Sequence, residues 1–176
     1  MLKNIAYLKS GNEKQRKVYN MIDQLHIMKD LQSYSPTLCG TIPLGIDTAS
    51  SDLDIIMEVH HLQDFVETVY DYYGYYSDFR IKKKTIRGKP VVKANFTYGE
   101  FEFELFGQAQ AVTDQYAYLH MVIEKYLLDE NPLWKNKIIA LKEKGLKTEQ
   151  AFCDMLGLTG DPYKALIDYG RGRQII

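Results

Sequence analysis

The sequence has few of the features that mark disulfide-rich, zinc-binding or membrane proteins. Only two of its 176 residues are cysteines, Cys39 and Cys153, and they form no Cys-x-x-Cys pair, which argues against a disulfide framework or a zinc ribbon. No apolar run approaches the roughly 18 residues of a membrane span. The first residues, Met1–Asn4, lack the apolar core of a signal peptide. We therefore expect a soluble, cytoplasmic protein in which both cysteines are buried.

An excess of charge of one sign is also missing. Lys and Arg number 22 and Asp and Glu 23, so the formal net charge is -1 and no global basic field recruits nucleic acid. With 45% hydrophobic and 26% charged residues, the composition is that of a folded domain with a substantial core. No repeat or Pro/Gly/Ser-rich linker divides the chain. We expect one compact unit, with an α/β core over residues 1–110 and a helical C-terminal part, residues 111–176, packed on it.

The first part of the chain mixes helical and β patterns. Val18, Ile22 and Leu25 recur at three- and four-residue steps after Asn12, a residue type that caps helices, and they predict a long amphipathic helix. Short apolar segments on either side of a Gly-containing stretch predict strands. The expected elements are a helix at 12–31, strands at 37–39 and 53–59, and a helix at 62–73.

Residues 75–106 have a β pattern, and the rest of the chain has a helical one. The last strand, Phe101–Phe106, alternates strictly between apolar and acidic residues, so one of its faces carries only carboxylates. Earlier strands are expected at 78–82 and 91–98, with turns at Arg87–Pro90 and Tyr98–Glu100. Further helices are expected at 114–129, 132–144, 148–156 and 162–169, the last three ending at Gly145, Gly157 and Gly170.

Asp52 and Asp54 are the strongest sign of chemistry in the sequence. They lie two residues apart in an expected strand, so their carboxylates project from the same face. Two like charges at that range repel each other unless a cation lies between them. A hard divalent ion takes carboxylate oxygens and keeps water or substrate phosphates as its other ligands. The pair therefore predicts an open site for Mg²⁺ or Mn²⁺.

Upstream of this pair, Gly40 and Thr41 end an expected strand and can begin a short helix. The free N–H groups of its first turn, together with the Thr41 hydroxyl, would form a cradle for an anion. Pro43 fits this interpretation, because the first turn of a helix loses no hydrogen bond to proline. A phosphate cradle followed by paired carboxylates suits metal-assisted attack on a nucleoside triphosphate.

Here the sequence resembles the DNA polymerase beta-type nucleotidyltransferase superfamily. That signature is an apolar residue, Gly, and Gly or Ser, followed after a spacer by Asp, an apolar residue, and Asp or Glu. Cys39-Gly40-Thr41, ten intervening residues and Asp52-Leu53-Asp54 match it, with Thr in the hydroxyl position. Minimal members also place Gly and Ser where Gly45 and Ser51 stand.

More narrowly, the chain resembles an uncharacterised domain-of-unknown-function family within that superfamily. The segments that carry this resemblance lie in the second half of the chain. Together with the motif around the Asp pair, they make the resemblance cover most of the sequence. They are Glu104–Gln108, Lys142–Glu149 and Gly160–Tyr163.

The resemblance implies an α+β fold, a nucleotidyltransferase-like mixed β-sheet flanked by helices, and a third carboxylate on a later strand. Glu102 and Glu104 lie on one face of the strand at 101–106, and the sequence does not choose between them; Glu100, at the turn, ranks lower. The implied catalytic residues are Asp52, Asp54, Glu102 and Glu104, with Asp52, Asp54 and Glu104 as metal ligands. The implied nucleotide-binding residues are Gly40, Thr41, Gly45 and Ser51.

The activity implied is transfer of a nucleoside monophosphate from a triphosphate such as ATP to a hydroxyl acceptor. Leu44 departs from the pattern, because many minimal members carry Arg at that position. A nucleotide-binding or interaction module of the same fold with little catalysis is therefore one alternative. An enzyme that attaches AMP to a protein partner is another. The acceptor stays open between a small molecule and a protein, and nucleic acid is less expected.

Two further patterns have both a structural and a functional interpretation. Arg80, Lys82 and Lys84 alternate on one face of a strand, which predicts either a solvated sheet edge or a track for phosphates, and we favour the edge. His120 and Glu124 lie four residues apart on an expected helix, a spacing typical of a local side-chain pair.

Overall fold

The computed structural model of the protein describes residues 4–176. The expectation that the first residues form no signal peptide falls mainly on residues 1–3, which lie outside the described residues. In the described part, no helix has both the length and the apolar character needed to cross a membrane.

The chain forms two compact units, and it passes between them three times. The chain leaves the first unit after Cys39, returns to it at Asp52 and leaves again after Val112. The loop that precedes the Asp pair thus belongs with the C-terminal helices. The expected grouping of residues 1–110 and 111–176 into one packed unit stays a prediction. The first unit holds residues up to Cys39 and Asp52–Val112, and the second holds Gly40–Ser51 and Thr113–Ile176.

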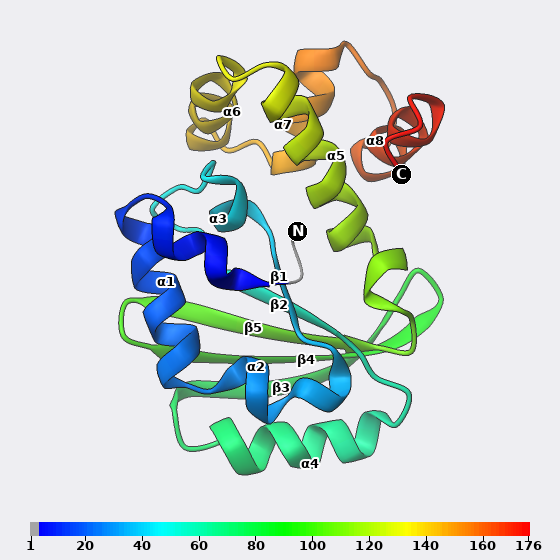
Figure 1. Ribbon diagram of the computed structural model, residues 1–176. Coiled ribbons are helices and arrows are strands. Elements are labelled where there is room, and N and C mark those ends of the chain that lie inside the picture. Colours follow the sequence, from blue (N-terminus) through cyan, green and yellow to red (C-terminus); the bar gives the residue numbers. More distant parts are fainter. Residues whose placement is uncertain (1–3) are drawn as a thin grey trace. The chain divides into compact units, whose positions relative to one another are not determined.

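The first unit is built on a mixed five-stranded sheet with the order β1-β2-β5-β4-β3 (Figure 1). Strands β2 and β5 are parallel, and the other neighbouring pairs are antiparallel. The strands are β1 (Thr37–Cys39), β2 (Leu53–Glu58), β3 (Ser77–Ile86), β4 (Lys89–Tyr98) and β5 (Phe101–Gln108).

Helix α4 (Leu62–Tyr73) covers one face of this sheet. Tyr73 stacks on Phe96 of β4 with 5.2 Å between ring centroids, and Phe96 stacks on Phe103 of β5 at 5.0 Å. A side chain at Gly107 would lie 2.7 Å from Val59 and 2.9 Å from Phe65, so the approach of α4 to β5 requires glycine there. Because side chains alternate along a strand, the acidic residues of β5 lie on the opposite face.

The long helix expected at 12–31 is interrupted in the structure. Helix α1 (Glu13–Gln24) ends early, and a short helix α2 (Ile27–Asp30) follows it. Between them His26 has φ 53°, a left-handed conformation that no α-helix can contain. The apolar spacing continues through the break, because Met28 follows Leu25 by three residues in the sequence, and this continuity explains the wrong prediction.

The strands β3 and β4 are longer than expected. The hairpin turn consists of Arg87 and Gly88, both with positive φ, so the expected turn residues Lys89 and Pro90 begin β4 instead. By contrast, the structure confirms the strand at 37–39, the helix at 62–73 and the helix at 148–156 at the expected boundaries.

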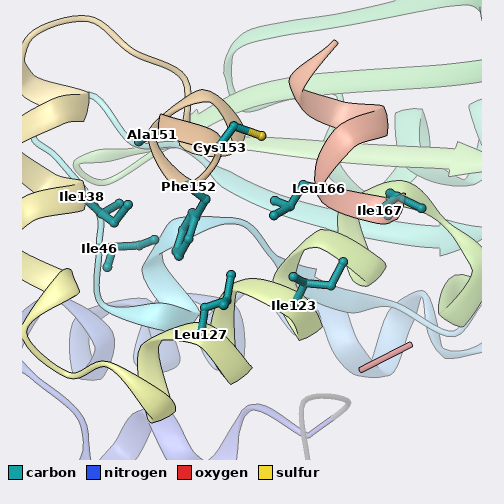
Figure 2. Close-up of a cluster of buried hydrophobic side chains, with 9 residues drawn as sticks. All are labelled: Ile46, Ile123, Leu127, Ile138, Ala151, Phe152, Cys153, Leu166 and Ile167. Carbon is teal, nitrogen blue, oxygen red and sulfur yellow. The ribbon is translucent and has the colours of Figure 1, made fainter. Parts of the chain in front are cut away.

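The second unit is helical, and its core is an apolar cluster shown in Figure 2. Ile138, Phe152 and Leu166 are buried completely in this cluster, and Cys153 is 6% exposed, as expected for a buried cysteine. Gly170 does not end the last helix, because α8 (Pro162–Gly172) continues beyond it. The helices are α3 (Thr41–Leu44), α5 (Tyr116–Glu130), α6 (Trp134–Glu143), α7 (Thr148–Leu156) and α8 (Pro162–Gly172).

Candidate functional site

Two parallel strands of the first unit bring three carboxylates together. Asp54 in β2 lies directly opposite Glu104 in β5. Asp52 lies two residues before Asp54, next to the start of β2. One carboxylate oxygen from each of the three residues lies within 4.8 Å of the other two. We call Asp52, Asp54 and Glu104 the carboxylate triad.

The chemistry of the triad fits a hard divalent cation. Its donors are all carboxylate oxygens, the ligands that Mg²⁺ and Mn²⁺ prefer. Three negative charges at this separation repel one another, and a cation among them offsets the repulsion. In this structure a lysine supplies one positive charge, because Lys93 Nζ lies 2.7 Å from Glu104 Oε2. Glu104 is only 17% exposed, so this ion pair is shielded from solvent more than a surface pair.

Glu102, the other candidate that the sequence left open, has different partners. Its carboxylate accepts a hydrogen bond from Arg80 and another, at 3.1 Å, from Asn95 Nδ2. Its side chain is 44% exposed. The structure therefore places Glu104 in the triad, whereas Glu102 lies on the same face but forms an ion pair with Arg80.

The four residues expected to bind nucleotide all lie in the loop Gly40–Ser51 of the second unit. Gly40 has φ 83° and Gly45 has φ 65°, so both adopt conformations that side chains disfavour. Between them lies the expected short helix, α3. The Thr41 hydroxyl donates a hydrogen bond to Ser51 Oγ at 3.1 Å, and the Thr48 N–H donates to the same oxygen at 2.9 Å. Ser51 thus closes the loop on itself before the chain enters β2.

The loop is fixed to the helices of its own unit by one apolar and one polar contact. Ile46 is completely buried in the cluster of Figure 2, where it lies among residues from α5 to α8. Lys142 Nζ donates a hydrogen bond to the Ile46 carbonyl at 2.8 Å. Leu44 packs against the same cluster, which explains an apolar residue at this position.

A group of buried charged residues lies beside this cluster. Glu124 of α5 is buried, and this burial, followed by repulsion from Glu149, raises its pKa to about 8, while Lys142 opposes the shift. His120 bonds to the Tyr163 carbonyl at 2.8 Å, and its Nδ1 lies 3.4 Å from Glu149. Although burial opposes ionisation of Glu149, the hydrogen bond from His120 holds its pKa below the usual value. The partner of His120 is thus Glu149 of α7, not Glu124 as its helix spacing suggested.

The sequence interpretation missed three residues that shape these sites. It did not place Lys93 beside a carboxylate. It attached no significance to Ile46 or Lys142, which hold the loop Gly40–Ser51, here called the glycine loop, against the helices of its unit. No local signal identifies any of them, since Lys142 and Ile46 are 96 positions apart in the sequence.

A family model described as "Domain of unknown function (DUF4269)" matches residues 20–169 of the chain. No curated protein sequence matches this chain. Among solved structures, the Cid1 poly(U) polymerase with MgGTP bound is similar, with a TM-score of 0.54 and 15% identity over 74% of this chain. The chain spans 42% of the length of that polymerase.

Two further solved structures share the fold. A GLD-2/RNP-8 complex has a TM-score of 0.53 and 15% identity, over 86% of this chain and 61% of the other. The polymerase core of TRAMP, an RNA surveillance complex, has a TM-score of 0.52 and 9% identity, over 92% of this chain and 50% of the other. The expected fold class is confirmed: an α+β, nucleotidyltransferase-like mixed sheet flanked by helices, followed by a helical C-terminal part.

Proposed function

Because the chain belongs to the DUF4269 family, whose description names no activity, we propose its function from its own residues: a metal-dependent nucleotidyltransferase of the DNA polymerase beta-type superfamily. It transfers a nucleoside monophosphate from a nucleoside triphosphate to a hydroxyl acceptor. The observation that carries this proposal is the convergence of Asp52, Asp54 and Glu104 from neighbouring strands within 4.8 Å.

In this proposal the carboxylate triad would hold divalent ions, Mg²⁺ or Mn²⁺. When bound, such ions polarise the α-phosphate and lower the pKa of the attacking hydroxyl. The acceptor oxygen forms a bond to the α-phosphorus as the bond from that phosphorus to the bridging oxygen breaks. Pyrophosphate leaves with the electron pair of the broken bond. The hydroxyl proton passes to the Glu104 carboxylate, and Glu102 instead positions Arg80 on the same face.

We assign binding of the β- and γ-phosphates to Gly40, Thr41, Gly45 and Ser51. The amide and hydroxyl of Thr41 lie at the start of α3, and donors at the start of a helix attract phosphate. Leu44 adds no positive charge, so the binding depends on backbone amides and hydroxyls. The hydrogen bond between Thr41 and Ser51 supports this assignment because it holds the loop in one conformation.

The similar solved structures support a triphosphate donor. The Cid1 poly(U) polymerase is described with MgGTP and with Mg 3'-dATP bound, and another similar structure is an RNA terminal U-transferase. These neighbours give no support to our lower expectation for nucleic acid as an acceptor. Small-molecule, protein and nucleic-acid acceptors therefore all stay within the proposal.

The test is a thermal-shift measurement with ATP, GTP, CTP and UTP, each with and without Mg²⁺. At a ligand concentration of about 100 Kd, binding to the native state adds about 2.7 kcal/mol, which raises Tm by roughly 5 °C or more in a chain of this size. We expect one triphosphate to give this shift only with Mg²⁺. The shift should vanish in Asp52→Asn and Asp54→Asn. It should persist in Glu58→Gln, which removes an acidic residue of β2 that lies outside the triad and contacts His60.

Release of pyrophosphate by the stabilised protein, measured with an acceptor mixture, would complete the case. A shift that needs no Mg²⁺ and survives both Asp variants would contradict the metal role of the triad. Binding without pyrophosphate release would favour the nucleotide-binding module. Transfer of labelled AMP to protein alone would identify the protein-modifying enzyme.

A further inference from the structure

The face of the sheet that carries the triad continues across two more strands as a positively charged surface. Strand pairing places Glu104 opposite Asn95 of β4, and Asn95 opposite Arg80 of β3. Directly paired residues point to the same face of a sheet. Arg80 therefore lies in the same cross-strand row, and on the same face, as Asp54 and Glu104.

The next rows along this face contain lysines. Lys82 of β3 lies opposite Lys93 of β4, and Lys84 lies opposite Val91. Because Lys82 and Lys84 are two positions apart in a strand, their Cα atoms are about 7 Å apart. Their ammonium groups thus form a short line that runs away from the triad along the edge strand β3.

The charges in these rows are not fully balanced within the protein. Arg80 is paired with Glu102, and Lys93 with Glu104. Lys82 and Lys84 are exposed, and neither forms an ion pair with any residue of the described part, 4–176. Two positive charges are therefore available to an anion on the face that carries the triad.

The opposite face of the same strand has a different role. Lys83 points toward α4, where its Nζ donates a hydrogen bond to Gln63 Oε1 at 2.7 Å. A lysine on either face of an edge strand hinders pairing with another strand, so edge protection explains Lys82, Lys83 and Lys84 equally well. Anion binding beside the triad involves only Lys82 and Lys84, because Lys83 lies on the other face.

We propose that Lys82 and Lys84 bind the phosphodiester backbone of a single-stranded nucleic acid whose terminal hydroxyl is the acceptor. This inference rests on the proposed function and names its acceptor class. Strand β3 lies two strands from β5, about 10 Å away, so one molecule reaches both places only if it is extended. A polynucleotide carries a negative charge at every repeat and a hydroxyl at its end, which matches a line of lysines leading to a carboxylate site.

The experiment measures binding of fluorescein-labelled 15-nucleotide single strands by fluorescence polarisation, in Mg²⁺ and over a series of salt concentrations. RNA and DNA of equivalent sequence are compared, which shows whether the ribose matters. We expect the double variant Lys82→Ala/Lys84→Ala to lose affinity at least tenfold. Because each phosphate contact with a single strand contributes about 0.7 to the slope of log K against log salt, that slope should fall by about 1.4.

Lys83→Ala is the matched control, since it removes the same charge from the same strand but from the α4 face. Its affinity and salt slope should equal those of the wild type. Circular dichroism and Tm check that all variants fold. We expect them to fold, because the substituted side chains are exposed. The inference is overturned if the wild type binds neither RNA nor DNA, or if Lys83→Ala loses as much affinity as the double variant.

The same variants separate this inference from the proposed function. In Lys82→Ala/Lys84→Ala, the Mg²⁺-dependent shift with triphosphate should persist, because these lysines bind the acceptor and not the donor. A triphosphate shift in a wild-type protein that binds no oligonucleotide would sink the inference and leave the nucleotidyltransferase in place. Oligonucleotide binding that depends on both lysines, without any triphosphate shift, would support the surface and contradict the proposed function.

Discussion

At the scale of single residues, the ion pair between Lys93 and Glu104 is the contact that bears most directly on the proposed metal site. The Lys93 ammonium lies 2.7 Å from a carboxylate oxygen that a divalent ion would also need. Two unit charges 4 Å apart interact by about 1 kcal/mol even in water, so this lysine opposes the binding of another cation nearby.

We therefore predict that Lys93→Met increases the affinity of the protein for Mn²⁺ by about fivefold, the equivalent of about 1 kcal/mol. Methionine keeps much of the apolar volume of the lysine stem and removes its charge. Titration calorimetry with Mn²⁺ measures the change. Lys83→Met, on the other face of the sheet, should bind Mn²⁺ as the wild type does. Weaker binding in Lys93→Met would mean that Lys93 supports the metal site and does not compete with it.

At the scale of secondary-structure elements, α8 shows how packing overrides a local signal. Glycine commonly ends helices, and Gly170 was expected to end this one. In the structure, Gly170 lies inside α8 and is buried, and a Cβ atom there would come within 2.6 Å of Ile123 Cγ1 in α5. The residue thus serves the close approach of two helices.

Gly170→Ala should accordingly destabilise the protein by about 1–3 kcal/mol, because the added methyl group overpacks the contact between α5 and α8. Gly172 is the matched control in the same helix, since nothing lies within 4 Å of a Cβ placed there. Gly172→Ala should leave the free energy of unfolding unchanged or raise it by up to about 1 kcal/mol, as alanine favours helix. Chemical denaturation of both variants tests this prediction, which equal stabilities would contradict.

At the scale of the whole molecule, the buried carboxyl of Glu124 makes stability depend on pH. Its pKa is about 8 in the folded protein, above the ordinary value of 4.5. Between these values the folded state binds a proton that the unfolded state has released. Stability from this group is therefore complete below about pH 4.5 and is lost as pH rises toward 8. The charges of Glu149 in α7 and Lys142 in α6 act on Glu124, and His120 lies one turn before it on α5.

From pH 5 to 8, Glu124 should reduce the free energy of unfolding by up to about 1.4 kcal/mol for each pH unit. Glu124→Gln carries no charge at any pH and should flatten this dependence. Glu130→Gln changes an exposed residue of the same helix and should keep the wild-type slope. Unfolding in denaturant at several pH values measures the slopes, and parallel curves for Glu124→Gln and the wild type would refute the prediction.

Also at this scale, local patterns predicted the parts of the molecule that depend on neighbours in sequence. Alternation in β5 put Glu102 and Glu104 on one face, and α4 and α7 lie at their expected boundaries. The interruption of the first helix at His26 was missed, because the apolar spacing continues across it. A hydrophobic pattern reports which side chains become buried, and it does not report where the backbone changes direction.

The sequence by itself determined the Asp pair, the glycine loop and the mixed α+β character, because each depends on residue types at short, fixed spacings. Only the tertiary structure chose Glu104 over Glu102 for the triad, since that choice depends on the register between β2 and β5 and on Arg80 from a third strand. It also decided that Lys82 and Lys84 share the face of the triad while Lys83 does not. The physical reason is that strand register and helix packing join residues far apart in sequence, and no local spacing encodes which of them meet.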